Sequence, residues 1–337
     1  MLHLSRRFAI FACAFACANA AHATTIDPNT ANSPFSGVVS INIQYSGKSF
    51  ICSGALVGAR SVVTSGSCVD TNGNGAAVDL NQPGSLVTVI FNSDGANNAQ
   101  VTASAITLHP NFQGFNVCPA AASPGNNCLG DDLAVLTLAA DAPASATIYS
   151  VATNPVTSGA SIVIAGYGNP GDGVTAEGGA SYTDKRTGAN QADVFDGNDE
   201  ADFGGANEVF YADFDGNGVD SFCSRIGVCT GQLAPGLEST IASGDIGGPV
   251  FVMQNGQLVL AGINTFTGGY GEPAGTFGSY FGGVLLASYG DFLLAATDGT
   301  VTLLPATPAG VPEPGSVALL GLGMLLLVGA RRRTRGF

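Results

Sequence analysis

A glycine-rich hexamer constrains this chain more than any other stretch. Gly244-Asp245-Ile246-Gly247-Gly248-Pro249 places three glycines around one aspartate, directly ahead of the apolar run Pro249–Met253. Glycines let a tight loop aim successive backbone N–H groups at one point, the geometry that holds an oxyanion, because side chains would crowd that approach. The alternative for the hexamer alone is a plain glycine-rich turn before a strand.

The composition favours strands over helices. Charged residues make up 11% of the 337 residues, glycine occurs 48 times, and tryptophan is absent. Such a chain suits many short strands joined by Gly, Asn and Ser turns. We therefore predict an all-β fold, after setting aside address signals at both ends.

The N-terminal end has the three parts of a secretory signal peptide. Arg6-Arg7 precede the apolar run Phe8–Ala18, and Ala21-His22-Ala23 is a small-x-small cleavage site. We expect residues 1–23 to be removed, so that the mature chain begins at Thr24, or alternatively at Ala21.

The C-terminal end, residues 311–337, also has three parts. Val311-Pro312-Glu313-Pro314 precedes the apolar run Val317–Ala330 and then an arginine cluster. This order resembles the PEP-CTERM sorting signal of Gram-negative, exopolysaccharide-producing bacteria. The resemblance implies a transmembrane sorting helix held transiently in the inner membrane, processing near Pro312, Glu313 and Pro314 by an exosortase, and a final place at the cell surface or outside the cell. A plain tail anchor is the alternative.

Without these ends the chain is strongly acidic. Six of its 11 basic residues and one of its 25 acidic residues lie in the two signals, which leaves a net charge near −19. So acidic a domain repels nucleic acid and anionic lipid. It suits an extracellular setting, divalent cations or basic partners.

Six cysteines remain after the signal peptide is removed. An even number in an exported chain predicts disulfides, and the short separations favour Cys52–Cys68, Cys118–Cys128 and Cys223–Cys229. Metal ligation by these cysteines is the weaker alternative, since none of them sits in a C-x-x-C pair.

Several segments along the chain are similar to the trypsin/chymotrypsin-like serine proteases. They occur in that family's order: Cys52-Ser53-Gly54-Ala55-Leu56-Val57, Val62-Val63-Thr64 before Cys68, Asp131-Asp132-Leu133-Ala134-Val135-Leu136, Gly166-Tyr167-Gly168, Gly244–Pro249 and Gly262–Phe266. The resemblance implies two antiparallel β-barrels with a cleft between them. It also implies that Cys52 and Cys68 are bridged.

The predicted organisation follows from this resemblance. Residues 24–36 form a leader and residues 37–297 the trypsin-like domain, with barrel one over about 37–140 and barrel two over about 145–297. A short helix is expected around Ser288–Ala296, and residues 298–310 are a linker. The polar stretch Asn169–Ala206 is predicted to be loop.

The catalytic residues depart from the family pattern. Ser67 stands where the resemblance places the catalytic histidine, and Ile246 stands where it places the nucleophilic serine; Asp132 is retained. A hydroxyl is no general base at neutral pH, and isoleucine is no nucleophile. Gly244 and Asp245 of the oxyanion loop are kept, but the chain shows no Ile-Val-Gly-Gly-type start to supply the amine that pairs with the aspartate in the family.

These residues lead to three functional hypotheses. The first is a catalytically inactive pseudoprotease that binds an unknown protein, peptide or polysaccharide, or has a structural role in an extracellular matrix or biofilm. The second is a serine-type endopeptidase with non-standard catalytic residues. The third is a calcium-stabilised structural or adhesion component.

The third hypothesis comes from the stretch Asp213-Phe214-Asp215-Gly216-Asn217-Gly218-Val219-Asp220. Oxygens at alternate positions followed by glycine suit a turn around a hard cation. Asp213, Asp215, Asn217 and Val219 are the candidate ligands for Ca²⁺. An ordinary Asn/Asp/Gly turn is the alternative.

Overall fold

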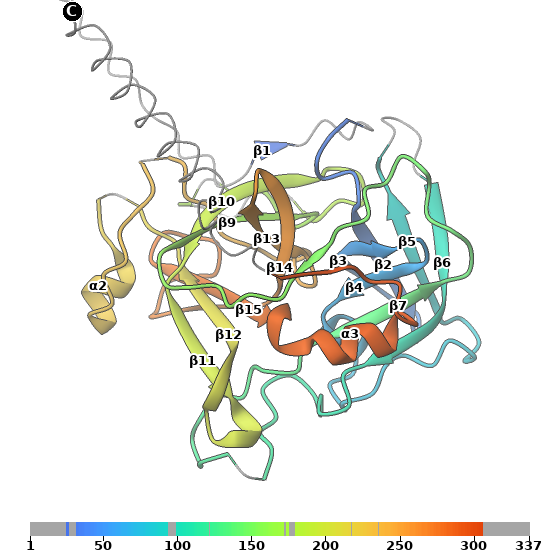
Figure 1. Ribbon diagram of the computed structural model, residues 1–337, viewed down its shortest axis with the longest axis horizontal. Helices are drawn as coiled ribbons and strands as arrows, with labels where there is room; N and C mark the ends of the chain where they lie inside the picture. Colours follow the sequence, from blue (N-terminus) through green and yellow to red (C-terminus); the bar gives the residue numbers. More distant parts are fainter. Residues whose placement is uncertain are drawn as a thin grey trace, which may run out of the picture.

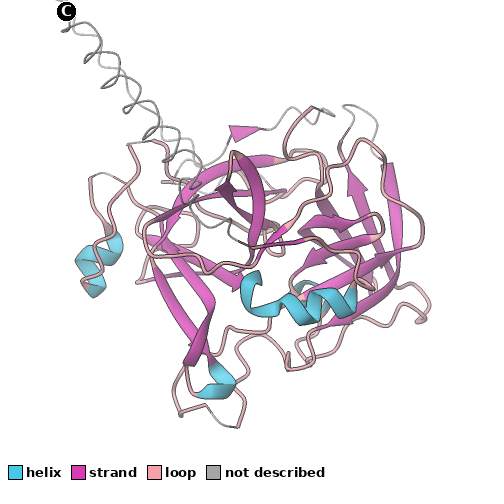
Figure 2. Ribbon diagram, viewed as in Figure 1, coloured by secondary structure: helices cyan, strands magenta, loops and turns pink. Residues whose placement is uncertain are grey.

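The computed structural model describes residues 25–26, 32–93, 99–120, 122–171, 173–174, 179–216, 218–234 and 236–305. Strands dominate this part of the chain (Figure 1), and its helices are short (Figure 2). The predicted all-β class is confirmed.

The first predicted barrel is present and closed. Its strands pair in the order β2-β3-β4-β7-β6-β5. On β2, Val39, Ile41 and Ile43 alternate along the strand and are fully buried, as a half-buried strand requires. A two-residue turn at Ser46-Gly47, with both φ angles positive, joins β2 to β3. The strand bounds are Val38–Tyr45 (β2), Lys48–Gly58 (β3), Ser61–Thr64 (β4), Leu86–Phe91 (β5), Ala99–Leu108 (β6) and Ala134–Leu138 (β7).

The second predicted barrel is a ten-stranded sheet without the closed path of the first. Its main strands pair in the order β1-β10-β9-β13-β14-β15-β12-β11, and β8 and β16 pair beside β14. The strand bounds are Thr25–Ile26 (β1), Val151–Ala152 (β8), Ala160–Gly166 (β9), Arg186–Ala192 (β10), Val194–Asn198 (β11), Gly204–Asp213 (β12), Pro249–Gln254 (β13), Gln257–Gly269 (β14), Ser279–Leu285 (β15) and Leu303–Leu304 (β16).

An apolar cluster joins the two halves. Val57 and Val63 of the barrel pack with Phe251 and Ile263 of the second sheet, and all four are fully buried. The expected C-terminal helix is α3 (Gly290–Ala296), which lies across the junction (Figure 1) and follows the 3₁₀ turn η2 (Leu286–Tyr289). The cleft-forming faces are therefore held by a common core.

The predicted loop at residues 169–206 is wrong in part. Within it, β10 pairs along its whole length with β9, and β11 forms a hairpin with β12. The sequence of β10, Arg-Thr-Gly-Ala-Asn-Gln-Ala, has no apolar alternation that would predict a strand. Most of these residues are only half-buried, so polar side chains are tolerated there. Backbone hydrogen bonds to β9 form this strand, and the pattern of side chains in the sequence does not reveal them.

All three disulfides join the predicted partners. Cα–Cα separations are 6.1 Å for Cys52–Cys68, 5.0 Å for Cys118–Cys128 and 4.4 Å for Cys223–Cys229. Among the described residues, no helix is long and apolar enough to cross a membrane. The predicted sorting helix, with Pro312, Glu313 and Pro314, lies outside them.

Candidate functional site

Ser67 lies in a short helix that is fixed to the first barrel. Ser65 caps α1 (Gly66–Val69) by accepting a hydrogen bond from the Cys68 N–H, and Cys68 is bonded to Cys52 on β3. The Ser67 hydroxyl donates to Ser65 Oγ at 3.2 Å. It is therefore paired with a second hydroxyl, which cannot act as its general base.

Asp132 lies directly beneath this helix. Its Oδ1 accepts a hydrogen bond from the Ser67 N–H at 2.6 Å, and the side chain is 1% exposed. Burial raises the pKa of Asp132 to about 6, and the hydrogen bond from Ser67 offsets part of that rise. Its Oδ2 is buried and has no hydrogen-bond partner within the described chain. Asp132 thus has one unpaired carboxylate oxygen beside position 67, where a histidine side chain would need a partner to orient it.

The hexamer forms a tight loop that is tied to both halves of the molecule. Gly244 and Gly247 have φ angles of +99° and +83°. The Ile246 carbonyl accepts a hydrogen bond from the Ser53 N–H at 2.9 Å, and the Gly247 N–H donates to Asn264 O at 2.7 Å. The half-buried Ile246 side chain packs against the cores of both the barrel and the sheet.

Two backbone N–H groups of this loop have no acceptor among the described residues. The N–H groups of Gly244 and Ile246, which alternate along the loop, donate no hydrogen bond to any group in the described part of the chain. Unpaired N–H groups beside a cleft are what an oxyanion site needs. Isoleucine, which has no nucleophilic atom, stands at position 246 of the loop.

A cleft of about 280 Å³ opens beside the loop and α1. Ile246 lines this cleft and does not close it. Of its polar residues, Asp70 is already engaged, because its two oxygens accept hydrogen bonds from the Asn74 and Gly75 N–H groups at 3.0 and 2.8 Å. The lining residues are Phe50, Ile51, Cys52, Ser67, Cys68, Asp70, Thr71, Ser243, Gly244 and Ile246.

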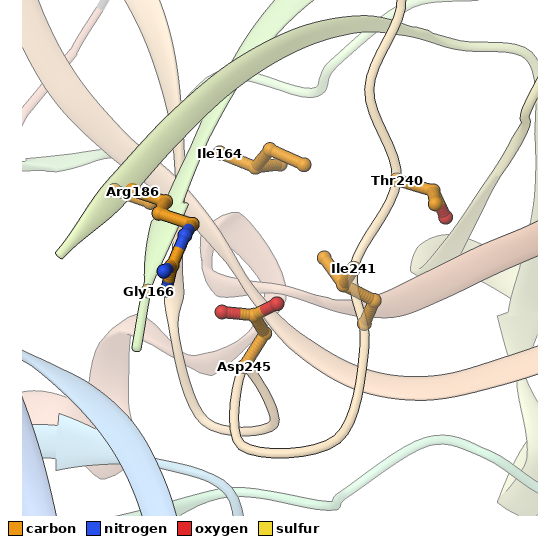
Figure 3. Close-up of a pocket in the computed structure, with 7 residues that line it drawn as sticks. Ile164, Gly166, Arg186, Thr240, Ile241 and Asp245 are labelled. Atoms are coloured by element: carbon orange, nitrogen blue, oxygen red, sulfur yellow. The ribbon is translucent and has the colours of Figure 1, made fainter. Parts of the chain in front are cut away.

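The Asp245 carboxylate is held from within the fold (Figure 3). It accepts hydrogen bonds from the Gly168 N–H at 2.7 Å and the Ala242 N–H at 3.0 Å. Burial raises the pKa of Asp245 to about 6, while these two hydrogen bonds and the positive charge of Arg186 lower it. Arg186 Nη1 in turn donates to Gly168 O at 3.1 Å. Two backbone N–H groups and a nearby guanidinium thus hold this carboxylate in the described chain.

The same carboxylate explains two glycines of the sequence. A Cβ on Gly166 would contact Asp245 Oδ1, and a Cβ on Gly168 would contact Asp245 Oδ2. The Gly-Tyr-Gly segment leaves room for the acid, and any larger residue would displace it.

The candidate calcium residues are brought together in part. One oxygen each of Asp213, Asp215 and Glu238 lies within 4.8 Å of the others, and all three side chains are buried. Burial raises the pKa of Asp213 and of Glu238 to about 8. Sequence reasoning missed Glu238, because it lies in a distant loop and carries no local motif. The Val219 side chain is exposed, and Asn217 lies outside the described residues.

A closed six-stranded barrel, a second and mainly antiparallel sheet, and a glycine-rich loop in the cleft between them define a chymotrypsin-like fold. The trypsin family model matches residues 27–281, so the chain belongs to the trypsin family. The PEP-CTERM protein-sorting motif matches residues 310–333. No curated protein matches the chain. The sorting motif is processed by exosortases and indicates export and surface sorting in Gram-negative bacteria, so this is an exported trypsin-like protein.

Proposed function

We propose that this protein is a catalytically inactive member of the trypsin family that acts by binding a protein or peptide in its cleft. The observation that carries the proposal is the pair Ser67 and Ile246 at the two positions where the reaction needs a base and a nucleophile. Loss of either group costs on the order of a million-fold in turnover.

Among the described residues that line the cleft there is no histidine, lysine or glutamate to serve as a replacement base. The Ser67 hydroxyl is bonded to Ser65, and both oxygens of Asp70 are bonded to backbone N–H groups. Ser243 is exposed on the rim, and its side chain has no hydrogen bond to a base within the described chain. The cleft and the free N–H groups of the loop support binding of an extended chain, whose carbonyl oxygens are acceptors.

The test is hydrolysis of casein and of a peptide library by the mature protein, together with fluorophosphonate labelling. We expect neither turnover nor label, with trypsin as the positive control. Turnover by the natural protein would favour the alternative endopeptidase with non-standard residues.

Binding is tested separately with displayed random peptides. Peptides that bind the natural protein should lose affinity for Ser243→Trp, which places a large ring at the cleft rim. Thr102→Trp, at an exposed position on β6, is the matched control. Equal loss in both variants would contradict binding in the cleft.

A second candidate function, a calcium-stabilised surface component, is favoured by Asp213, Asp215 and Glu238. The Asp215 Oδ2 atom is buried without a partner, while its Oδ1 accepts a hydrogen bond from the Ser221 N–H at 2.8 Å. A free carboxylate oxygen between two other acids is suited to a cation. Calcium should raise the melting temperature of the protein, and Glu238→Gln should reduce that rise. No change on adding a chelator would count against this function.

A further inference from the structure

A second group of acids lies where the two halves of the molecule meet. Asp131 precedes β7 in the barrel, whereas Asp199 and Glu200 form η1 (Asp199–Ala201) at the end of the β11–β12 hairpin. One oxygen from each of the three lies within 4.8 Å of the others. Oxygens on opposite sides of a calcium ion are separated by about 4.6–5.2 Å, since each lies at 2.3–2.6 Å from the metal.

A fourth acid borders this group. Glu208 on β12 directs Oε2 toward Gly130: a Cβ built on Gly130 would lie 3.1 Å from that oxygen and 3.5 Å from Asp199 Oδ2. The other oxygen of Glu208 accepts a hydrogen bond from Asn198 Nδ2 at 2.7 Å. Asn198 thereby orients the carboxylate, and the glycine leaves the space between the two acids open.

Three oxygens of this group lack any partner. Asp199 Oδ1, Glu200 Oε2 and Glu208 Oε2 are each buried without a hydrogen bond in the described residues. Asp199 is 4% exposed and Glu208 is 7% exposed, so both side chains are largely removed from bulk solvent. Buried carboxylate oxygens left unpaired are costly, and they call for a counter-charge.

Among the described residues, His109 is the basic side chain found beside this group, and no Lys or Arg contacts it. The neighbouring imidazole, His109, has Nδ1 at 2.8 Å from Asp131 Oδ1. The five Lys and Arg residues of the described chain lie or bind elsewhere. Lys48 is exposed on β3, Arg60 donates to Leu138 O, Lys185 donates to Phe35 O, Arg186 donates to Gly168 O and Arg225 pairs with Glu272.

We infer that Asp131, Asp199 and Glu200, bordered by Glu208, bind a divalent cation of the calcium type that ties the β11–β12 hairpin to the barrel. The donors are all carboxylate oxygens, which hard cations prefer. This site differs from the group at Asp213 and does not depend on it. Because Asp131 immediately precedes Asp132, the cation also fixes the segment that places the acid beneath Ser67.

The test is calcium titration of the EDTA-treated mature protein by calorimetry and thermal melting. At a hundredfold excess over the dissociation constant, we expect calcium to raise the melting temperature by roughly 5–10 °C. Glu200→Gln and Asp199→Asn should each lower the calcium stoichiometry by one. Asp202→Asn is the matched control, an exposed acid on the same hairpin whose carboxylate accepts a hydrogen bond from the Ser123 N–H.

Two readouts separate a metal site from a structural role of the acids. Without calcium, Glu200→Gln should melt at or above the temperature of the natural protein, because it removes a charge from a group of like charges. With calcium the order should reverse. Hydrogen exchange should show that calcium protects residues 129–133 and 198–203 together, since one ion holds both segments.

Asp215→Asn distinguishes this site from the other acidic group. It should leave the calcium protection of residues 129–133 and 198–203 intact. The inference is overturned if both Glu200→Gln and Asp199→Asn keep the full stoichiometry and thermal shift of the natural protein. It is also overturned if calcium protects neither segment.

Discussion

The double variant Ser67→His with Ile246→Ser should restore protease chemistry to this scaffold. The scaffold for both residues is in place: Asp132 accepts a hydrogen bond from the Ser67 N–H at 2.6 Å, and the Gly244 and Ile246 N–H groups are free in the described chain. An imidazole at position 67 would find the buried Asp132 Oδ2, which has no partner. We therefore expect the double variant to react with a fluorophosphonate and to cleave peptides.

The magnitude follows from these contacts. An oxyanion site and substrate binding alone give roughly 10³–10⁴-fold over water, whereas an optimised nucleophile and base add about 10⁶-fold. A scaffold not adapted to either residue should recover part of this, and we expect at least about 100-fold over the natural protein, or about 2.7 kcal/mol of barrier. Pairing Asp132 Oδ2 with an imidazole N–H should also contribute about 1–3 kcal/mol to the stability of Ser67→His alone.

The assay compares the natural protein, each single variant and the double variant by single-turnover labelling and by thermal melting. Adding Asp132→Asn to the double variant is the control, because it presents the wrong partner to the imidazole and should reduce turnover by about 10⁴-fold or to background. If the folded double variant stays silent and Ser67→His is less stable than the natural protein, Asp132 is not placed to orient a base and the reasoning fails.

Three further predictions follow from the same region. Gly247→Ala should destabilise the fold by more than about 2 kcal/mol, since its Cβ would contact Thr64 Oγ1 and φ is +83°; Gly256→Ala, with φ +78° and open space around its Cβ, should cost only about 1 kcal/mol in denaturant melts. Asp245 should titrate near pH 6 in carboxyl NMR. Because its pKa is higher in the folded than in the unfolded state, its contribution to stability is greatest below pH 4 and declines by about 3 kcal/mol as the pH rises through 6. A titration of Asp245 below pH 4 would contradict this prediction. Replacing both cysteines of Cys52–Cys68 by alanine should lower the free energy of unfolding by about 3 kcal/mol in denaturant melts, as the bridge closes a loop of 16 residues; an unchanged midpoint would show that α1 is held by packing alone.

Sequence reasoning succeeded where the physical cause is local. The alternation in β2 and the glycines of the hexamer, with their positive φ angles, are properties of neighbouring residues, and each predicted its element. It failed where the cause is distant. The polar β10 exists because β9 lies alongside, and Glu238 meets Asp213 only after the chain has folded. The sequence also could not predict that the cleft beside Ile246 is open, because the orientation of that side chain decides whether it fills the space.

The strand β1 imposes an order on folding. Thr25 of β1 pairs with Thr187 of β10, so the start of the chain docks on residues made 162 positions later. Contacts this distant in sequence form slowly, because a long loop must close before they contribute. The pairing of β1 with β10 therefore cannot form until the chain has been made through β10. Until β1 docks, the edge of β10 that faces away from β9 is open and could pair with another chain, so the protein is most prone to aggregation at that stage.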